Sequence, residues 1–384
     1  SATFDYLADG EELVLKYTVR ANDDNNITDP KTGEISASNE QVITITITGT
    51  NDKPTLTGAS DVQYSVTEDV TTAPTTEADI ITGRVTDADV SDKLSVTKVN
   101  GTEVKTANTD INGTYGKLVI SPDGKYYYEL DNSNGNTQAL QKGQDVKDVF
   151  TVTVGDGKGG TVDQTITVNV TGTNDSPDIR TESGDSAEKG FTEGSSLQTT
   201  GTLTLTDADI ADTVSAKVGG VVVGGTHTLT TLQEAGFLKD PSKLLEMLQI
   251  KSTDAPESSY SSLANVLSNT ETGADGNVTW KFNAGSEKFA FLNEGETLTL
   301  TYTIKADDKQ DVTMEADGNE ISTDTTTVTI TITGTNSEPV LKTDLVTLTE
   351  DNGKLDGTHP PVSKAGNIFT NDTDPDFNGK DHWN

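Results

Sequence analysis

The stretch Thr48-Gly49-Thr50-Asn51-Asp52, with Pro54 two residues on, ends a run in which threonine alternates with β-branched residues. It recurs at residues 171–175 before Pro177 and, with Ser337 in place of the last aspartate, at residues 333–337 before Pro339. The copies begin 123 and 162 residues apart, which fits one β-sandwich domain and then one such domain with an insertion. Because Gly, Asn and Asp followed by Pro end a strand, each copy predicts a junction between two domains.

The strands that precede these junctions alternate with a period of two. Residues 42–48, 165–170 and 327–333 place β-branched residues on one face and mostly threonine on the other, as half-buried strands of a sandwich do. A second recurrent strand, at residues 12–19, 148–154 and 297–304, is expected to form a hairpin with each closing strand. The sequence therefore predicts an all-β chain of tandem Ig-like β-sandwich domains.

The junction spacing sets the expected domain boundaries. Residues 51–174 and 175–336 are predicted to be two complete sandwiches, residues 1–50 the C-terminal part of one repeat, and residues 337–384 the N-terminal part of another. Ser1 does not begin a signal peptide, so we expect an internal segment of a longer protein.

One stretch of the second sandwich breaks the β pattern. Between about residues 228 and 268 the apolar residues follow a helical spacing, and Asp240 and Pro241 stand where a helix would begin. We therefore expect an insertion of short helices. Two interpretations stay open: a lid over one end of the sandwich, or a modified face that binds a ligand or a neighbouring domain.

The chain is strongly acidic. It has 27 Lys and Arg against 62 Asp and Glu, a formal charge of −35, so nucleic acid and anionic membranes are repelled and cations are the expected partners. It has no cysteine, which leaves core packing and bound metal as stabilisers and favours an exported protein. No apolar stretch is long enough to predict insertion into a membrane.

The sequence shows no catalytic motif that we recognise. Its three histidines, His227, His359 and His382, accompany neither a Gly-x-Ser-x-Gly nor a His-Glu-x-x-His pattern. Without thiols, a zinc site is not expected either. We therefore predict that the protein is not an enzyme.

Pairs of aspartates mark the start of each predicted domain. The pairs are Asp87 with Asp89, Asp207 with Asp209, and Asp374 with Asp376, and the first two are followed by Asp92 and Asp212. Carboxylates two residues apart on an extended chain point the same way, which is unfavourable unless a cation lies between them. Further acids follow each first strand and each penultimate strand. The pattern therefore indicates metal binding at the domain starts.

Together these motifs resemble those of a known family. The Thr-Gly-Thr-Asn-Asp-x-Pro junctions, with Thr-Glu-Asp and Thr-Asp-Ala-Asp, look like the VCBS and bacterial cadherin-like (Ig-like) repeats of large RTX-type adhesins secreted by type I systems. Residues 115–177 are similar to a VCBS unit almost throughout, and residues 366–376 look like the start of a cadherin-like domain. The resemblance implies a VCBS-like sandwich at residues 51–174 and a cadherin-like one at residues 175–336, followed by the start of a further cadherin-like repeat.

In cadherin-like arrays calcium lies between domains, and the resemblance implies which residues meet there. Each junction combines a linker Asn-Asp, the Asp-x-Asp of the following domain, the aspartate after its penultimate strand, and the first-strand glutamate of the preceding domain. The first junction would use Asn51, Asp52, Asp87, Asp89 and Asp156. The second would use Glu68, Asn174, Asp175, Asp207, Asp209 and Asp307. The third, with Ser337 in place of the linker aspartate, would use Glu193, Asn336, Asp374 and Asp376.

The resemblance also implies a function. The chain would be a calcium-rigidified extender, or spacer, of a bacterial cell-surface adhesin, extracellular, and would project a distal binding domain for cell attachment or biofilm formation. Its partners would be calcium ions and the neighbouring repeats of the same chain. The alternative is a ligand-binding module of the same adhesin, in which the insertion and the face around Trp280 bind surface glycan, a peptide or another copy of the chain.

Overall fold

The computed structural model describes the placement of most of the chain. The described residues are 4–21, 28, 30–31, 33, 40–105, 108–210, 212–234, 240, 242–262, 265–268, 277–309, 322–345, 372–374 and 376. Residues 346–371 and 377–384, which hold most of the last predicted repeat, lie outside this set, as does the predicted helix-start residue Pro241. The chain divides into two compact units, residues 1–173 and residues 174–384, and each contains one β-sandwich.

The first unit contains a sandwich and a separate hairpin. The hairpin pairs β1 (Glu12–Val19) with β2 (Gln41–Thr48). One sheet of the sandwich has the order β5 (Ala78–Asp79), β11 (Lys125–Leu130), β10 (Gly116–Ile120) and β9 (Thr109–Asn112). The other has the order β4 (Asp61–Thr67), β13 (Thr161–Thr171), β12 (Asp145–Gly155), β7 (Ser95–Val99) and β8 (Thr102–Glu103). The remaining elements are β3 (Thr55–Leu56), β6 (Val85–Thr86) and the helix α1 (Gly135–Gln138).

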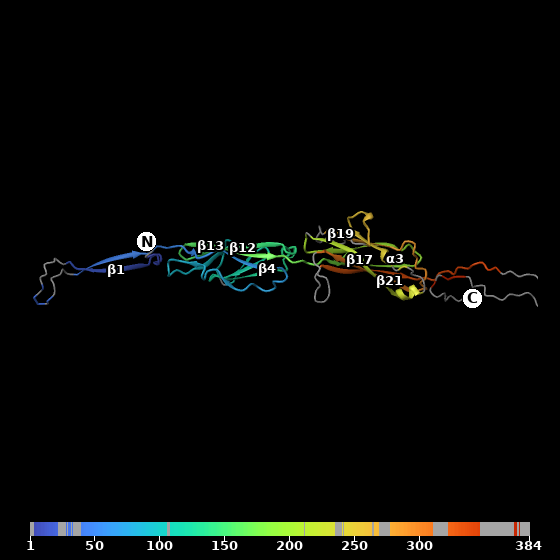
Figure 1. Ribbon diagram of the computed structural model, residues 1–384, viewed down its shortest axis with the longest axis horizontal. Helices are drawn as coiled ribbons and strands as arrows, with labels where there is room; N and C mark the ends of the chain where they lie inside the picture. Colours follow the sequence, from blue (N-terminus) through green and yellow to red (C-terminus); the bar gives the residue numbers. More distant parts are fainter. Residues whose placement is uncertain are drawn as a thin grey trace, which may run out of the picture. The chain divides into compact units, whose positions relative to one another are not determined.

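The core of this sandwich follows from the alternation along its strands. In β12, Phe150, Val152 and Val154 are buried, whereas Val149, directly before Phe150, is exposed. Tyr128 of the other sheet packs against Phe150, with ring centroids 6.2 Å apart, so the two inner faces share one apolar core. The opening strand β4 pairs in parallel with the closing strand β13, and both belong with β12 to one sheet; Figure 1 labels all three strands.

The second unit repeats the plan on a larger scale. One sheet has the order β14 (Asp178–Arg180), β16 (Gln198–Thr206), β20 (Val278–Asn283) and β18 (Leu248–Ser252). The other has the order β15 (Glu188–Thr192), β22 (Thr323–Thr333), β21 (Thr297–Asp307), β17 (Thr213–Gly225) and β19 (Asn265–Ser268). Its helices are α2 (Leu229–Glu234), α3 (Ser242–Glu246) and the 3-10 turn η1 (Glu257–Ser259). The protein is therefore an all-β chain of tandem β-sandwiches, which confirms the predicted fold class.

The insertion is only partly helical. The helices α2 and α3 form where expected and bury Leu232 and Leu244, but the apolar residues that follow belong to the strand β18. Leu248 and Ile250 alternate with polar residues and pair with β20, so the period changes from helical to extended after α3. The prediction of helical spacing up to residue 268 was therefore wrong for its second half.

Trp280 does not lie on a binding face. Its side chain is fully buried, and its indole N–H donates a hydrogen bond to the backbone oxygen of Ser186, 2.6 Å away. The core of the second sandwich also contains Phe282 and Tyr302, which pack edge to face. The part of the module interpretation that placed a glycan on Trp280 is thus wrong, because a ring at the centre of a packed core cannot contact a sugar.

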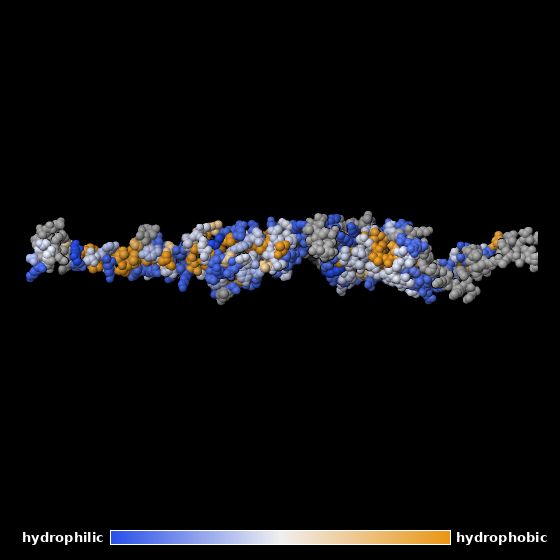
Figure 2. Space-filling view, turned by 60° about the horizontal axis from the view of Figure 1, so that its bottom comes forward, coloured by the Kyte–Doolittle hydropathy of each residue, from blue (hydrophilic) through white to orange (hydrophobic). Residues whose placement is uncertain are grey.

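The β1–β2 hairpin has the same register as the closing hairpins of the two sandwiches. Leu13 pairs with Ile47 in it as Leu298 pairs with Ile332 in β21–β22. The equivalent face is fully buried in the second sandwich, whereas in the hairpin several apolar side chains are exposed, and Figure 2 shows apolar residues along this part of the chain. On the equivalent face of the hairpin the exposed ones are Tyr17, Val19, Ile43 and Ile45, and on its other face Val14 and Val42 are exposed as well. This contrast supports the proposal that residues 1–50 are the closing part of a sandwich.

A recurrent turn fixes the direction in which the chain leaves each closing strand. The backbone N–H groups of Gly49, Gly172 and Gly334 donate to the backbone oxygens of Glu11, Gln144 and Glu296, each at 2.8 Å. A Cβ atom at Gly172 would lie 2.4 Å from a backbone oxygen, and one at Gly334 would lie 2.3 Å from another, so only glycine fits. The backbone therefore makes the same turn after each closing strand, and the linker residues follow it in the same way.

Candidate metal sites

Three segments bring the acidic residues of a first cluster together. Asn51 follows β2 by three residues, Asp87 directly follows β6, and Asp156 directly follows β12. The pairing of β3 with β6 holds the linker after Asn51 beside the strand that leads into the Asp-Ala-Asp loop. All these segments belong to the first unit, at the end of the sandwich where its chain begins.

Hydrogen bonds link the segments. The amide nitrogen of Asn51 donates to Asp156 Oδ2 at 3.0 Å, and the backbone N–H of Asp52 donates to Asp89 Oδ2 at 2.7 Å. The backbone N–H of Asp89 donates to Asp87 Oδ1 at 3.1 Å. Asp52 thus contributes its backbone, while its side chain is exposed. Each bond uses one oxygen of a carboxylate and leaves the second one for another partner.

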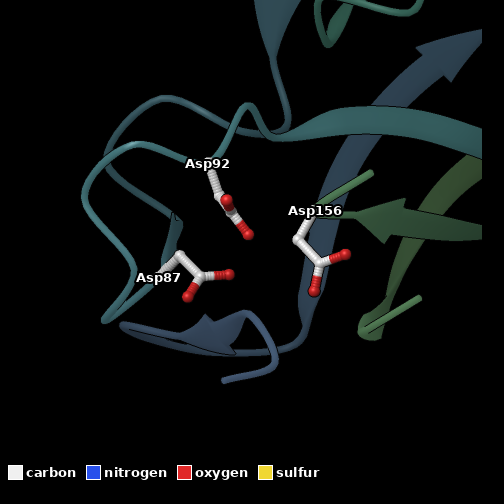
Figure 3. A group of neighbouring side chains, drawn as sticks. All are labelled: Asp87, Asp92 and Asp156. Atoms are coloured by element: carbon white, nitrogen blue, oxygen red, sulfur yellow. The ribbon is translucent and has the colours of Figure 1, made fainter. Parts of the chain in front are cut away.

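The oxygen atoms of this cluster point to a common space. One oxygen from each of Asp87, Asp92 and Asp156 lies within 4.8 Å of the others, and Figure 3 shows the three side chains around one space. Four oxygens here are buried and have no hydrogen-bond donor among the described residues: Asn51 Oδ1, Asp87 Oδ2, Asp89 Oδ1 and Asp92 Oδ2. Such atoms are rare because each costs about 1–3 kcal/mol of desolvation.

The electrostatics of the cluster are unfavourable without a cation. Burial raises the pKa of Asp87, and repulsion from Asp89 and Asp156 raises it further. Burial and the charge of Asp89 likewise raise the pKa of Asp92. Burial also acts to raise the pKa of Asp156, but hydrogen bonds from Asn51 and from the backbone N–H groups of residues 158–160 hold it below its ordinary value. Asp156 therefore stays ionised beside two carboxylates that resist ionisation.

The second unit begins with the same arrangement. The amide nitrogen of Asn174 donates to Asp308 Oδ2 at 3.1 Å, the backbone N–H of Asp175 donates to Asp209 Oδ2 at 2.9 Å, and the backbone N–H of Asp209 donates to Asp207 Oδ1 at 3.0 Å. Each bond has a counterpart of the same type in the first cluster. Because the two sequences differ in length and in the insertion, the repetition identifies this hydrogen-bond pattern as a unit of the architecture.

The second cluster is more deeply buried than the first. Asp207, Asp209, Asp212 and Asp308 are each at most 4% exposed. Burial raises the pKa of Asp207 to about 7, and the charges of Asp308, Asp212 and Asp175 contribute to the shift. Burial, with repulsion from Asp175, Asp212 and Asp207, raises the pKa of Asp209 to about 7 as well. A bound cation would lower both pKa values and offset the free-energy cost of burying these charges.

Asp308, and not the predicted Asp307, contributes to this cluster. The strand β21 ends at Asp307, whose side chain is half exposed and accepts a hydrogen bond from the backbone N–H of Lys309. Side chains alternate along a strand, so the next residue, Asp308, points the other way and is buried beside Asn174. The sequence offered two adjacent aspartates, and only the position of the strand end distinguishes them.

The third set of residues lies within the second unit. The backbone N–H of Asp376 donates to Asp374 Oδ1 at 2.9 Å, and the backbone N–H of Ser337 donates to Asp376, as the linker aspartates do in the other clusters. Glu193 is buried, accepts a hydrogen bond from the backbone N–H of Thr335 at 2.9 Å, and has a raised pKa because of burial and the charge of Asp376. Asn336 is exposed. Glu193 and Asp376 therefore lie close enough to repel each other.

Glu68 has the same local role in the first unit as Glu193 in the second. It is fully buried, and its Oε2 accepts a hydrogen bond from the backbone N–H of Thr173 at 3.0 Å. Its Oε1 accepts from the side-chain amide of Gln138. In both units the glutamate at the end of the opening strand therefore binds the Thr-Gly-Thr-Asn segment that follows the closing strand.

Three further acids belong to the clusters although they were not among the predicted ligands. The backbone N–H of Asp92 donates to the backbone oxygen of Asp89 at 3.1 Å, and that of Asp212 donates to the backbone oxygen of Asp209 at 2.9 Å. The third is Asp308. Asp92 and Asp212 were visible in the sequence as acids three residues after each pair, and the single turn that this spacing forms could have identified them.

The donor set fits a hard cation. It consists of carboxylate and amide oxygens, with no sulfur or imidazole ligand among the described residues of the clusters. Calcium binds six to eight oxygens of this kind in flexible geometry, while zinc and other softer metals select nitrogen and sulfur. The buried oxygens of Asn51, Asp87, Asp89 and Asp92 are the ones that a calcium ion would satisfy in the first cluster.

Comparison with known proteins finds a family likeness for the first sandwich. Residues 51–172 match the model of the bacterial cadherin-like domain family, although these are the residues predicted to be VCBS-like. The matched segment runs from Asn51 to the end of the sandwich and so includes the whole first cluster. No curated protein sequence matches the chain.

Solved structures of low sequence identity also align with the chain. Mouse protocadherin-24 EC1-3 aligns at 13% identity over 84% of this chain and 79% of that one, with a TM-score of 0.31. Mouse cadherin-23 EC22-24 aligns at 14% identity over 76% and 70%, with a TM-score of 0.32. The I67-I69 fragment of titin aligns at 12% identity over 85% and 94%, with a TM-score of 0.28. In the described part of the chain, no helix has the length and apolar character needed to cross a membrane.

Proposed function

We propose that the chain is a calcium-dependent spacer of an extracellular bacterial adhesin, in which calcium at the start of each sandwich fixes that sandwich relative to the one before it. The observation that carries the proposal is the repetition of one hydrogen-bonded acidic cluster at the start of both sandwiches. A ligand-binding site occurs once in a module, whereas a structural joint recurs with the repeat.

The buried oxygens support calcium as the ion. A solvated acidic surface would leave its carboxylates exposed, but Asp89 is 1% exposed and Asp156 is 2% exposed. Two like charges at this depth are retained when a bound cation compensates them. The cadherin-like match over residues 51–172 supports an adhesion-type module, and the RTX and VCBS relationship, the bacterial cell surface and the role in attachment or biofilm formation remain parts of the proposal.

Glu68 and Glu193 are the ligands that we propose from the preceding repeat at the second and third joints. Glu68 and Glu193 close the opening strand of their sandwich and bind the backbone of the linker that leads to the next cluster. In the third set the charge of Asp376 already raises the pKa of Glu193. An ion held by such a glutamate together with the aspartates of the following repeat would cross-link two repeats, which is how calcium would stiffen the chain.

Small-angle X-ray scattering tests the spacer function. Without calcium, repulsion among the bare carboxylates lets the sandwiches change orientation, so we expect a broader distribution of dimensions in chelator than in millimolar calcium. The control is magnesium at the same ionic strength, which screens charge without satisfying the same coordination. Scattering profiles that coincide in calcium and chelator would exclude calcium-dependent stiffening.

A further inference from the structure

The outer edge of β17 in the second sandwich lacks a neighbouring strand along its C-terminal half. β17 pairs with β21 from Ser215 to Gly225, but on its other side β19 pairs only with residues 213–216. Among the described residues, the segment 220–225 therefore has a β-strand partner on one side only. Backbone N–H and C=O groups along such an edge can pair with another strand.

The composition of this edge is unusual for so acidic a chain. Residues 218–233 form the longest run without a charged residue in the sequence. On the opposite edge of the same sheet, β15 carries Glu188 and Lys189, and charges of this kind discourage edge-to-edge pairing. Within the uncharged edge, Val222 is 66% exposed, while Val221 and Val223 turn inward and pack against the core. The edge is thus neutral and β-branched, and the side chain of Val222 is exposed on the outer face of the sheet beside it.

Among the described residues, nothing explains two of the glycines on this edge, Gly220 and Gly224. Gly219 lies at a β-bulge, and Gly225 has a φ of +95° and a backbone oxygen 2.3 Å from the position of a Cβ atom. At Gly220 and Gly224, by contrast, a Cβ atom would meet nothing within 4 Å, and neither residue has a positive φ. Glycine inside a strand weakens it, and often marks a place where another backbone approaches closely.

From these observations we propose that the segment 220–225 of β17 is a self-association edge, which pairs antiparallel with the same segment of a second copy of the chain. A two-fold axis makes one edge sufficient for both partners. The partner strand must be neutral, because the edge offers no charge to pair with. A second copy of the chain presents such a strand at the same segment, and pairing there keeps the acidic residues that give each chain its net charge of −35 out of the contact. The two five-stranded sheets would become one continuous sheet. This surface is separate from the acidic clusters and does not depend on the spacer proposal.

Analytical ultracentrifugation of the 384-residue chain tests the proposal. We expect a concentration-dependent dimer that is favoured by added salt, since salt screens the repulsion between two acidic chains. Val222→Lys places a charge on the exposed edge without touching the core and should raise the dimer dissociation constant by at least about tenfold. In hydrogen exchange, the amides of residues 220–225 should become more protected as protein concentration rises.

Two control variants make the test specific. Val149→Lys introduces the same charge at a valine that is 52% exposed in the other sandwich, and should leave the dimer unchanged. Thr301→Lys changes the residue that pairs with Val222 in the central strand β21, so it charges the same sheet face but not the edge. A chain that stays monomeric up to a few hundred micromolar, or a dimer weakened equally by Thr301→Lys and Val222→Lys, would overturn edge pairing.

Discussion

Asp89 and Asp209 occupy equivalent positions in two sandwiches that share little sequence outside the repeated motifs. Each accepts a hydrogen bond from the backbone N–H of a linker aspartate and donates its own backbone N–H to the first aspartate of the pair. The sequence predicted these pairs because like charges at this spacing are unfavourable without a cation. Asp308 could not be chosen over Asp307 in advance, because that choice depends on where β21 ends.

Removing the charge of one pair should weaken calcium binding at one cluster only. Asp207→Asn with Asp209→Asn keeps the size and hydrogen-bonding capacity of both side chains but removes the negative charge that a hard cation needs. We expect the calcium dissociation constant of that cluster to rise at least about tenfold, measured by isothermal titration calorimetry.

The matched control uses acids outside the clusters. Asp254→Asn with Glu257→Gln removes the same charge from two exposed residues of the insertion. This variant should keep the calcium stoichiometry of the wild type. Equal loss of binding in both double variants would mean that the ions are diffuse counter-charge around the chain and that the assigned ligands are wrong.

The raised pKa values of Asp207 and Asp209 predict a pH dependence. Both rise from 3.8 to about 7 in the calcium-free fold, so the folded state binds protons more tightly than the unfolded state. The calcium-free second unit should therefore lose stability as the pH rises from about 4 to about 7. Calcium, which needs the ionised form, should release protons when it binds at slightly acidic pH. Titration calorimetry in two buffers of different ionisation enthalpy measures this release, and identical apparent enthalpies near pH 6 would contradict it.

At the scale of elements, the closing hairpins were the most predictable part of the fold. The alternation of threonine with isoleucine or valine in β22 and β13 fixes which face is buried, and the register of β21–β22 follows from it. The structure of the insertion was harder to predict, because short apolar segments such as the one at Leu248 fit either a helix or a strand. Pairing with β20 makes this segment a strand. The parallel pairing of β4 with β13 joins residues far apart in sequence and left no local signal.

The junction glycine provides a test of the recurrent turn. In Gly172→Ala, the new Cβ atom would lie 2.4 Å from the backbone oxygen of Gln141, so the turn must move. We expect a loss of about 1–3 kcal/mol in the free energy of unfolding of the first unit, measured by chemical denaturation followed by circular dichroism. The control is Gly58→Ala, where a Cβ atom meets nothing within 4 Å and stability should not fall. A Gly172→Ala chain as stable as this control would show that the turn is not sterically fixed.

At the scale of the whole molecule, the charge of −35 makes stability depend on cations in two ways. Any cation screens the general repulsion among the acidic side chains, and this effect depends on ionic strength rather than on the identity of the ion. An ion bound at the clusters acts only on the folded chain, because the linker, the Asp-Ala-Asp loop and the strand end meet only there. These two effects can be separated, since only the second one is selective.

Thermal unfolding in calcium and in magnesium separates them. A ligand that binds only the folded chain stabilises it by about 2.7 kcal/mol per site when present at a hundredfold excess over its dissociation constant. Magnesium is smaller and loses its waters reluctantly, so crowded clusters of oxygens such as the one around Asp156 should favour calcium. We therefore expect a clear rise in Tm with calcium and a much smaller one with magnesium at matched ionic strength. If both ions raise Tm equally, screening explains the whole effect, and the repeated clusters are acidic surfaces rather than calcium sites.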